Sequence, residues 1–328
     1  MATNRDIRQG LLDHNTGFRI MFEDAYNNAD PGFFANWTER IDANGVQQIT
    51  LAFLTNTPAW RKWTGAKQHK NLRSYTQTIT YDKYEATMSL KRDMVDYDTT
   101  GVLGRTLQKW ISANVIDVFD QFIAESMDGS SGAGPVGFDG ENLYDTGHVH
   151  GPSSSATQSN LGAGSNLSHS TLVTAEHTAL LWQEENGRPV RPNFNLMRVG
   201  PKLKRRAQEL LSADRVVTVN TDGTMDTTRS ASSTYEIQAA STRSSVWQGD
   251  MTLVVDPRVT TYYWDLHDTT KGYKPMILFV TRAPEPIALT DMTDPDRFNH
   301  DEYVYSVEAD FGVAAGHWYA TYRGTGTA

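Results

Sequence analysis

Cysteine is absent from the 328-residue sequence. Its absence excludes disulfide bonds, thiolate nucleophiles and thiolate metal sites, and it is compatible with synthesis in a cytosol. Long apolar runs are also missing, since none approaches the roughly twenty residues that a membrane helix needs. The N-terminal stretch MATNRDIRQGLLDHN is charged and lacks the apolar centre of a signal peptide. We therefore expect a soluble protein that has no membrane partner.

Positive charge is in deficit, because 39 Asp and Glu residues outnumber 30 Lys and Arg residues and give a net charge of −9. A chain of this sign is poorly suited to gripping phosphates, so we expect no tight binding to nucleic acid. The 38% of hydrophobic residues, with eight Trp and fourteen Tyr, are typical of a folded protein. The length suffices for one large domain or two ordinary ones.

The stretch LRSYTQTITYDKYEATMSLKR, residues 72–92, predicts two strands joined by a turn. Alternation places Tyr75, Ile79 and Tyr81 on one face and threonines on the other, and neither face is apolar enough to form a core. An isolated hairpin is marginal in water, and ordering about twenty residues costs roughly 30 kcal/mol. We therefore expect a partner surface to cover this ribbon.

The clearest helix is predicted over residues 101–127, where apolar residues recur at intervals of three and four. Further helices are predicted in LSHSTLVTAEHTALLWQEENG and, opened by Pro201, in KLKRRAQELLSAD. The polar segment 220–245 is predicted to be an exposed loop. Strand-like runs are NFNLMRVG, DMTLVVDPRV, YYWDLHD, PMILFVTR, EYVYSVEADFGVAAG and WYATYRG. Helices and strands in segregated blocks predict an α+β fold.

Motifs for catalysis or cofactor binding are weak throughout the chain. GAGPVG at residues 132–137 has dinucleotide-binding spacing, but it contains Pro135 and opens no predicted helix. His148 and His150 with nearby Asp145 could form a metal site, and a metal-dependent hydrolase built on them is an alternative function. Their spacing matches no zinc motif, so roles in a loop are the simpler interpretation. The sequence therefore predicts no catalytic, cofactor-binding or metal-binding residues.

Several moderate motifs follow one another in a characteristic order: AFLTNTPAWRKWTGAKQHKNLRSYTQTITYDKYEATMSLKRDMVDYD, the long helix, GENLYDTGHVH, ENGRPVRPNFNLMRVGPKLKRRAQELL and FNHDEYVYSVEADFGVAAGHWYATYRG. This order resembles the major head subunit (major capsid protein) family of Mu-like tailed bacteriophages. The resemblance implies the Hong Kong 97-type capsid fold, in which an extended loop lies over a neighbouring subunit. It also implies a structural protein, not an enzyme, that self-assembles as hexamers and pentamers into an icosahedral head.

On this resemblance we expect an N-terminal arm over 1–50 and an extended loop with its base over 51–95. A peripheral domain over 96–166 would contain the long helix 101–127 as its spine, an axial domain would occupy 167–290, and strands over 291–328 would return to the peripheral domain. The uncovered ribbon is then explained by a neighbouring subunit. Aromatic side chains bury much area at low entropy cost, so seven are expected at subunit interfaces: Trp60, Trp63, Tyr75, Tyr81, Tyr84, Phe18 and Phe22.

The resemblance further implies partners and a location. The partners are other copies of the chain, a portal protein, decoration or scaffolding proteins, and packaged double-stranded DNA that is held without specific binding. The location is the virion, after synthesis in the cytoplasm of a host bacterium. A cellular shell of the same fold that stores cargo is an alternative within the structural class, and the DNA content of purified particles distinguishes the two.

Overall fold

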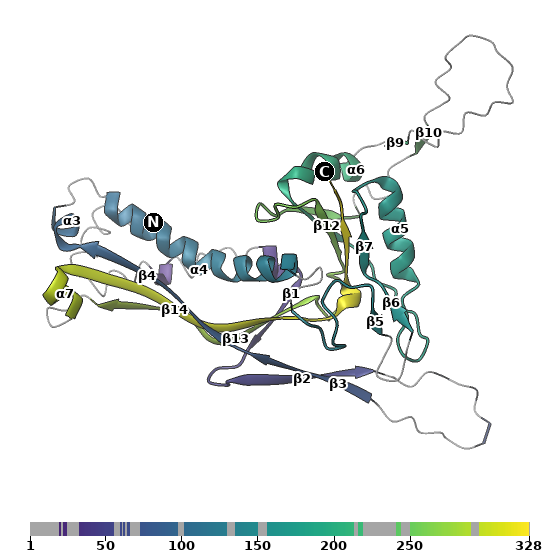
Figure 1. The fold of residues 1–328 in the computed structure, drawn as a ribbon, viewed down its shortest axis with the longest axis horizontal. Helices are drawn as coiled ribbons and strands as arrows, with labels where there is room; N and C mark the ends of the chain where they lie inside the picture. The colour runs from purple at the N-terminus through teal and green to yellow at the C-terminus, as the bar shows by residue number, and fades with distance from the viewer. Residues whose placement is uncertain are drawn as a thin grey trace, which may run out of the picture.

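The computed structural model describes residues 20, 22–24, 33–55, 60, 62, 64–65, 73–97, 102–129, 135–149, 156–212, 216–218, 241–243, 250–289 and 295–327. The molecule is elongated, and two β-sheets follow one another along its long axis (Figure 1). A long helix, α4 (Val102–Gly129), runs beside the first sheet, whereas α5 (His169–Leu180) and α6 (Lys204–Ser212) accompany the second. The predicted α+β class is confirmed. None of the helices in the described part of the chain combines the length and apolar character needed to cross a membrane.

The first sheet, called the long sheet, has the strand order β1-β13-β14-β4. Its central strands β13 (Met276–Leu289) and β14 (Glu302–Ala315) are antiparallel. β1 (Thr38–Asp42) runs parallel to β13, and β4 (Asp82–Lys91) runs antiparallel to β14. Every second residue of β14 from Tyr303 to Phe311 is buried, which is the period of a strand with one face on a core.

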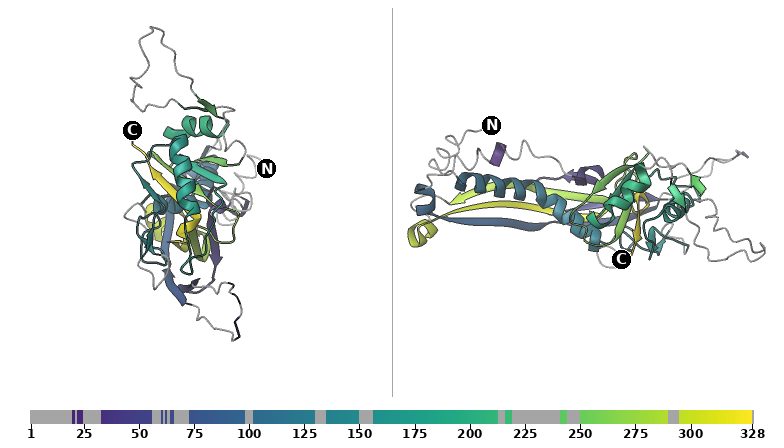
Figure 2. Two further views of the ribbon diagram at one scale, coloured as in Figure 1. Left: turned by 90° about the vertical axis from the view of Figure 1, so that its right-hand side faces the viewer. Right: turned by 90° about the horizontal axis from the view of Figure 1, so that it is seen from above.

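Helix α4 confirms the predicted long helix and differs from the predicted range 101–127 by only a residue or two at each end. Its large apolar buried side chains, among the described residues, recur at multiples of four residues: Leu107, Ile111, Phe119, Ile123 and Met127. Four residues turn an α-helix by about 40° more than a full turn, so the buried face rotates slowly along the helix. Helix α4 lies along the strands of the long sheet when seen from above (Figure 2).

The second sheet, called the five-stranded sheet, has the order β11-β8-β12-β15-β7. Its central strand β12 (Tyr263–His267) pairs antiparallel with β8 (Leu196–Val199) and with β15 (Thr321–Thr325). Strand β8 is buried along its whole length, as expected for the run NFNLMRVG. Helix α5 begins with a capping box, in which the Ser168 hydroxyl accepts from the Thr171 N–H and Thr171 Oγ1 accepts from the Ser168 N–H.

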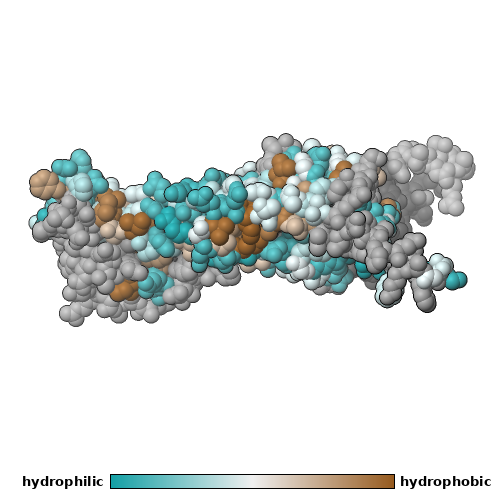
Figure 3. Space-filling model, turned by 90° about the horizontal axis from the view of Figure 1, so that it is seen from below, coloured by the Kyte–Doolittle hydropathy of each residue, from teal (hydrophilic) through white to brown (hydrophobic). Residues whose placement is uncertain are grey.

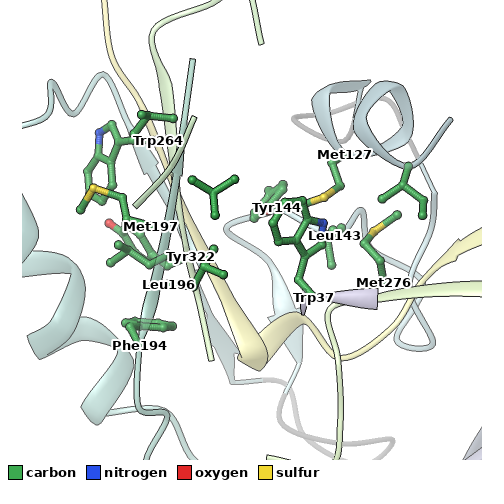
Figure 4. Packing of buried hydrophobic residues seen from close by; sticks show 14 of the residues in the cluster. Trp37, Met127, Leu143, Tyr144, Phe194, Leu196, Met197, Trp264, Met276 and Tyr322 are labelled. Carbon is green, nitrogen blue, oxygen red and sulfur yellow. The ribbon is translucent and has the colours of Figure 1, made fainter. Parts of the chain in front are cut away.

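One continuous hydrophobic core joins the two sheets (Figure 4). On the side of the long sheet it contains Trp37, Met127 and Met276, and on the side of the five-stranded sheet it contains Phe194 and Trp264. The two sheets therefore belong to one packed body.

The remaining elements are short. β11 (Thr252–Val255) and β7 (Leu161–Ala163) edge the five-stranded sheet. Three pairs of strands stand apart from the two sheets: β2 (Gln48–Thr55) with β3 (Arg73–Thr80), β5 (His148–Val149) with β6 (Thr157–Gln158), and β9 (Val216–Thr218) with β10 (Ser241–Arg243). The short helices are η1 (Phe33–Asn36), α3 (Arg92–Asp96), η2 (Pro201–Leu203), α7 (Pro295–His300) and η3 (Trp318–Ala320).

The hairpin predicted within residues 72–92 is wrong. β3 pairs with β2, whereas β4 pairs with β14 in the long sheet. Only Tyr81 separates β3 from β4, and one residue is too short for a hairpin connection, so the chain passes straight from one sheet into the other. Alternating hydrophobicity identified both strands but could not identify their partners.

Three strands show how the expected ranges are distributed between the two sheets. β4, which ends the range 51–95 expected for the extended loop with its base, lies in the long sheet. β13 lies in the long sheet although it falls within 167–290, and β15 lies in the five-stranded sheet although it falls within 291–328. Strands distant in sequence share a sheet here, so sequence ranges alone could not divide the fold.

Candidate subunit-interface surfaces

A two-stranded finger, formed by β2 and β3, extends from the base of the long sheet (Figure 1). Its register runs from the pair Gln48 and Thr80 to the pair Thr55 and Arg73. One face carries apolar residues that lie on the same hydrophobic cluster as Ile277 and Phe279 of β13. The expectation that neither face of this ribbon has a core is therefore wrong for the inner face. The covered side chains of β2 and β3 are Ile49, Leu51, Phe53, Tyr75 and Ile79.

The outer face of the finger is polar and exposed. Thr50 and Thr78 lie opposite each other there, with their hydroxyl oxygens 3.2 Å apart. Threonine suits an exposed strand because its branched side chain favours the extended backbone while its hydroxyl is solvated. The outer face is thus the part of the finger that its own subunit leaves uncovered.

The aromatic residues predicted at interfaces fall into different environments. The Tyr84 ring packs within its own subunit, with centroids 4.2 Å from Phe311 and 4.4 Å from Phe122. Tyr75 is half-buried 5.5 Å from Phe138, and burial, followed by the charge of Asp139, raises its pKa.

Phe22 is almost fully buried in a cluster with Leu107, Ile111 and Tyr303, so it leaves little surface for a neighbour. Tyr81 is half-buried at the edge of the cluster beneath the finger. Trp60 is fully exposed and remains a predicted interface residue. Trp63 and Phe18 lie outside the described residues.

The side chain of His148, the centre of the alternative metal site, is held in place by hydrogen bonds and ring stacking. Its Nδ1 lies 2.7 Å from a carboxylate oxygen of Asp139, and its Nε2 lies 3.2 Å from the side-chain oxygen of Asn160. The ring is fully buried and stacks on Trp318 at 4.5 Å. Both ring nitrogens are thus engaged in holding the loop 139–149 against the core.

The other members of the proposed metal site do not complete it. Asp145 accepts hydrogen bonds from the N–H groups of Thr146 and Gly147 within its own turn. His150 lies outside the described residues. Among the residues that the structure describes, no group of three or more His, Asp or Glu could hold a metal ion. The hydrolase alternative therefore finds no support.

Comparison with known proteins shows to which family the chain belongs. The family "Mu-like prophage major head subunit gpT" matches the chain over residues 11–184 and 240–327. The chain belongs to this family. No curated protein matches the sequence of this head subunit.

Solved capsids share the fold of the head subunit. A chain of the procapsid of bacteriophage JBD30 is 19% identical with a TM-score of 0.53, and the match covers 95% of the head subunit and 73% of that chain. The capsid of an empty GTA particle gives 10% identity and a TM-score of 0.53 over 91% of each chain. A virus-like particle from Pyrococcus furiosus gives 8% identity and a TM-score of 0.50 over 93% of the head subunit and 96% of that chain.

These structural matches confirm the Hong Kong 97-type capsid fold, and the family match confirms the predicted function as a major capsid protein of a phage head. The head subunit therefore assembles with copies of itself and resides in the virion. The fold is shared by the virus-like particle as well, so the assignment to a phage head rests on the family match.

The head subunit also contains a buried ionic network that sequence reasoning missed. Asp265 on β12 lies directly opposite Arg198 on β8 and Arg323 on β15. Its carboxylate accepts from Arg323 Nε and Nη2 at 2.6 and 2.8 Å and from Arg198 Nη1 at 2.9 Å. Arg198 also donates to Asp256 at 2.9 Å. Two arginines are thus paired across three adjacent strands inside the five-stranded sheet.

The same network attaches α4 to the five-stranded sheet. Arg323 Nη1 donates to the carbonyl oxygen of Met127 at 2.7 Å, in the last turn of α4. Asp128 on that turn lies 3.4 Å from Arg198 and 3.7 Å from Arg323. A cation at a helix C-terminus complements the helix dipole, so the arrangement fixes this end of α4.

The positive charges in this network affect the pKa of Asp265 more strongly than burial does. Burial alone would raise the pKa of Asp265, but the charges of Arg323 and Arg198 outweigh it and lower the pKa to about 2. Burial lowers the pKa of the neighbouring His267 to about 3, so this ring is neutral. No sequence motif marks these residues, because their positions in the chain are far apart.

Proposed function

We propose that the head subunit forms an icosahedral shell of hexamers and pentamers in which the finger of each subunit lies over a neighbouring copy. The observation that carries the proposal is the family match, combined with a two-stranded finger whose outer face is uncovered. Two strands alone are marginally stable in water, so contact with a neighbour would stabilise the finger beyond its anchored base.

We assign the parts of the fold to this role as follows. The chain before β1 supplies the arm, and β2 with β3 supply the extended loop. The long sheet and α4 form the peripheral domain with its spine helix, and the five-stranded sheet with α5 and α6 forms the axial domain. The grouping of the strands into two sheets supports this division.

The role that we propose is structural and includes no catalysis. The packaged molecule is double-stranded DNA, and the net charge of −9 supports containment without adhesion because like charges repel. A portal and decoration or scaffolding proteins complete the particle, and the subunit is made in the cytoplasm of the host bacterium. Sub-micromolar binding of DNA to the unassembled subunit at physiological salt would contradict the proposed containment.

Shortening the finger tests its role directly. Thr55 and Arg73 lie opposite each other, so Asn-Gly in place of residues 56–72 joins them through a two-residue turn. We expect a subunit that folds with an unchanged melting temperature but forms no shells in electron micrographs. The cut stops short of β4, because removing β4 would remove a strand of the long sheet.

A matched control is available at the other short hairpin. Thr218 of β9 and Ser241 of β10 also lie opposite each other, so Asn-Gly can replace residues 219–240 in the same way. Most of that segment falls in the gap of the family match, and we expect this variant to form shells. Intact shells from the finger variant would refute the role of the finger, whereas the absence of shells from the unaltered protein would refute the proposed function.

A further inference from the structure

The face of the head subunit drawn in Figure 3 is largely hydrophilic, and its hydrophobic side chains gather in a few patches. Exposed apolar patches are typical of contacts between proteins, and assembly into a shell accounts for them. A cavity lined by uncompensated charge attracts ligands of the opposite charge instead. One such cavity lies after α5, at the loop formed by residues 182–191. We call this loop the arginine turn, because it carries Arg188 and Arg191.

The arginine turn is anchored to the neighbouring strand β6. The side chain of Gln158, the last residue of β6, donates to the Gln183 carbonyl oxygen at 2.8 Å and accepts from the Gln183 N–H at 2.7 Å. Within the turn, the Glu184 N–H donates to the Arg188 carbonyl oxygen at 2.8 Å. These bonds fix the backbone that carries the arginines before any ligand binds, and such preorganisation lowers the cost of binding.

Lys271 fixes the other end of the arginine turn. Its Nζ donates to the carbonyl oxygens of Val190 and Arg191 at 2.8 and 2.6 Å, and it lies 3.7 Å from the buried carboxylate of Asp268. Arg191 has a φ of 53°, in the left-handed region that residues other than glycine adopt only rarely. Conformations of this kind cluster at ligand-binding sites, where the surrounding contacts maintain them. Lys271 thus maintains a backbone conformation of a type found at functional sites.

The arginine turn forms one wall of an open cavity of about 560 Å³. Arg188, Arg191 and Lys271 line this cavity together with Glu184 and Tyr273. The charge of Lys271 is compensated by its buried carboxylate partner, whereas neither guanidinium group has an ion-pair partner among the described residues. Two uncompensated cations against one carboxylate give the cavity a positive charge, in a chain whose net charge is −9. The cavity is therefore suited to an anion.

Tyr273 adds an uncharged hydrogen-bond donor to the two guanidinium groups. Its hydroxyl has no hydrogen-bond partner in the part of the chain that the structure describes. Burial, followed by the charges of Asp268 and Glu184, raises the pKa of Tyr273. The hydroxyl therefore keeps its proton at neutral pH and can donate it to an oxygen of a ligand.

We propose that this cavity binds inorganic phosphate between the guanidinium groups of Arg188 and Arg191. A planar guanidinium group matches the oxygens of a phosphate or a carboxylate through two parallel hydrogen bonds. A carboxylate has two oxygens and one guanidinium group occupies both, whereas a phosphate has enough oxygens for both arginines and for the hydroxyl of Tyr273. The inference is independent of the proposed function, because it concerns the single subunit.

The carboxylate of Glu184 selects among anions of this shape. Inorganic phosphate retains at least one proton at neutral pH, so one of its oxygens can donate a hydrogen bond to Glu184. Sulfate and the phosphodiesters of DNA have no such proton, and the carboxylate repels their charge. The cavity therefore prefers phosphate to both, and it does not oppose the containment of DNA without adhesion.

Titration calorimetry of the dilute subunit at pH 7 and constant ionic strength tests the site. The unaltered subunit should bind phosphate about 10-fold or more tightly than sulfate or acetate. Arg188→Gln and Arg191→Asn should each weaken the binding of phosphate by about 10-fold or more, because each removes charge-assisted hydrogen bonds. Asparagine tolerates the left-handed conformation, so Arg191→Asn leaves the turn intact. Arg205→Gln, at an exposed position of α6, makes the same change in charge and should alter the affinity by less than about 2-fold.

Glu184→Gln tests the origin of the selectivity. The glutamine amide can donate to sulfate and carries no charge, so sulfate should then bind within about 3-fold of phosphate. Three results would overturn the inference: no saturable binding of phosphate to the unaltered subunit, equal losses in Arg188→Gln and Arg205→Gln, or equal affinity of the unaltered subunit for phosphate and for sulfate or a DNA duplex. All three are measured on the dilute subunit, so an absence of shells, which would refute the proposed function, leaves this test unaffected.

Discussion

The buried carboxylate of Asp265 is the place where a single substitution should destabilise the fold most directly. Asp265→Asn keeps the shape of the side chain and removes its charge. Arg323 then loses its two short ionic contacts, at 2.6 and 2.8 Å, and retains Asp128 at 3.7 Å together with the Met127 carbonyl oxygen. Arg198 loses its contact at 2.9 Å and retains Asp256. Two arginines without exposure to water thus remain with less negative charge around them.

The expected loss of stability follows from two independent routes. The pKa of Asp265 falls from 3.8 to about 2, and this shift corresponds to about 2 kcal/mol in favour of the charged form in the folded state. Breaking buried ion pairs by removing one partner costs about 3–5 kcal/mol in other proteins. We therefore expect Asp265→Asn to lower the free energy of unfolding by about 2–5 kcal/mol, or the melting temperature by about 3–7 °C.

The exposed pair formed by Arg40 and Asp42 provides the control. Its atoms are also 2.8 Å apart, but the two side chains are 39% and 55% exposed. Asp42→Asn should therefore cost less than about 1 kcal/mol. Both variants are compared with the unaltered subunit by urea unfolding at pH 7, monitored by circular dichroism below the concentration at which shells form. Equal midpoints for the two variants would refute the reasoning that burial gives the network its strength.

Two further variants test other parts of the fold. Burial lowers the pKa of His317 to about 4, so the folded state keeps this ring neutral while the unfolded state takes up a proton below about pH 6.5. The free energy of unfolding should therefore fall by about 3 kcal/mol as the pH drops from 6.5 to 4. In His317→Phe this contribution is absent, so the urea midpoint of the variant should fall less over the same pH range than that of the unaltered subunit. At Gly312, an added Cβ would collide with the Thr80 carbonyl oxygen at the base of the finger, whereas Gly272 has open space. Gly312→Ala should thus lower the free energy of unfolding by about 1–3 kcal/mol, as measured by urea unfolding. Gly272→Ala is the control and should leave the midpoint unchanged. Equal midpoints for the two variants would contradict the prediction, because they would show that the strands separate freely to admit the methyl group.

Local patterns in the sequence predicted most elements of the fold correctly. The intervals of three and four between apolar residues identified α4, and the alternation in EYVYSVEADFGVAAG identified β14. Ser168 and Pro201 stand where α5 and η2 begin. These signals depend only on the backbone period and on the groups that cap a helix, so nearby residues contain them completely.

Strand partners and buried charges could not be read in this way. Alternation shows that a strand has two different faces, but it does not say which strand lies beside it, and so the hairpin at residues 72–92 was predicted wrongly. Charged side chains are mostly exposed, so nothing in the sequence marked Arg198, Asp265 and Arg323 as members of a buried network. Only strand pairing brings them together.

The predicted interface aromatics illustrate the same limit at the candidate site. Composition indicated that the finger needed a covering surface, and the order of motifs indicated a capsid family, which the comparisons confirm. The structure then placed Tyr84 and Phe22 in the subunit's own clusters and left Trp60 exposed. Aromatic character is equally suited to a core or an interface, so the three-dimensional path of the chain had to decide between them.

The sequence by itself determined the class of the fold, the long helix and the family, because these depend on composition and on the local order of residues. The tertiary structure alone decided which strands pair and that Asp265 compensates two buried arginines. Those features depend on distances between residues far apart in the chain, and such distances exist only after the chain has folded.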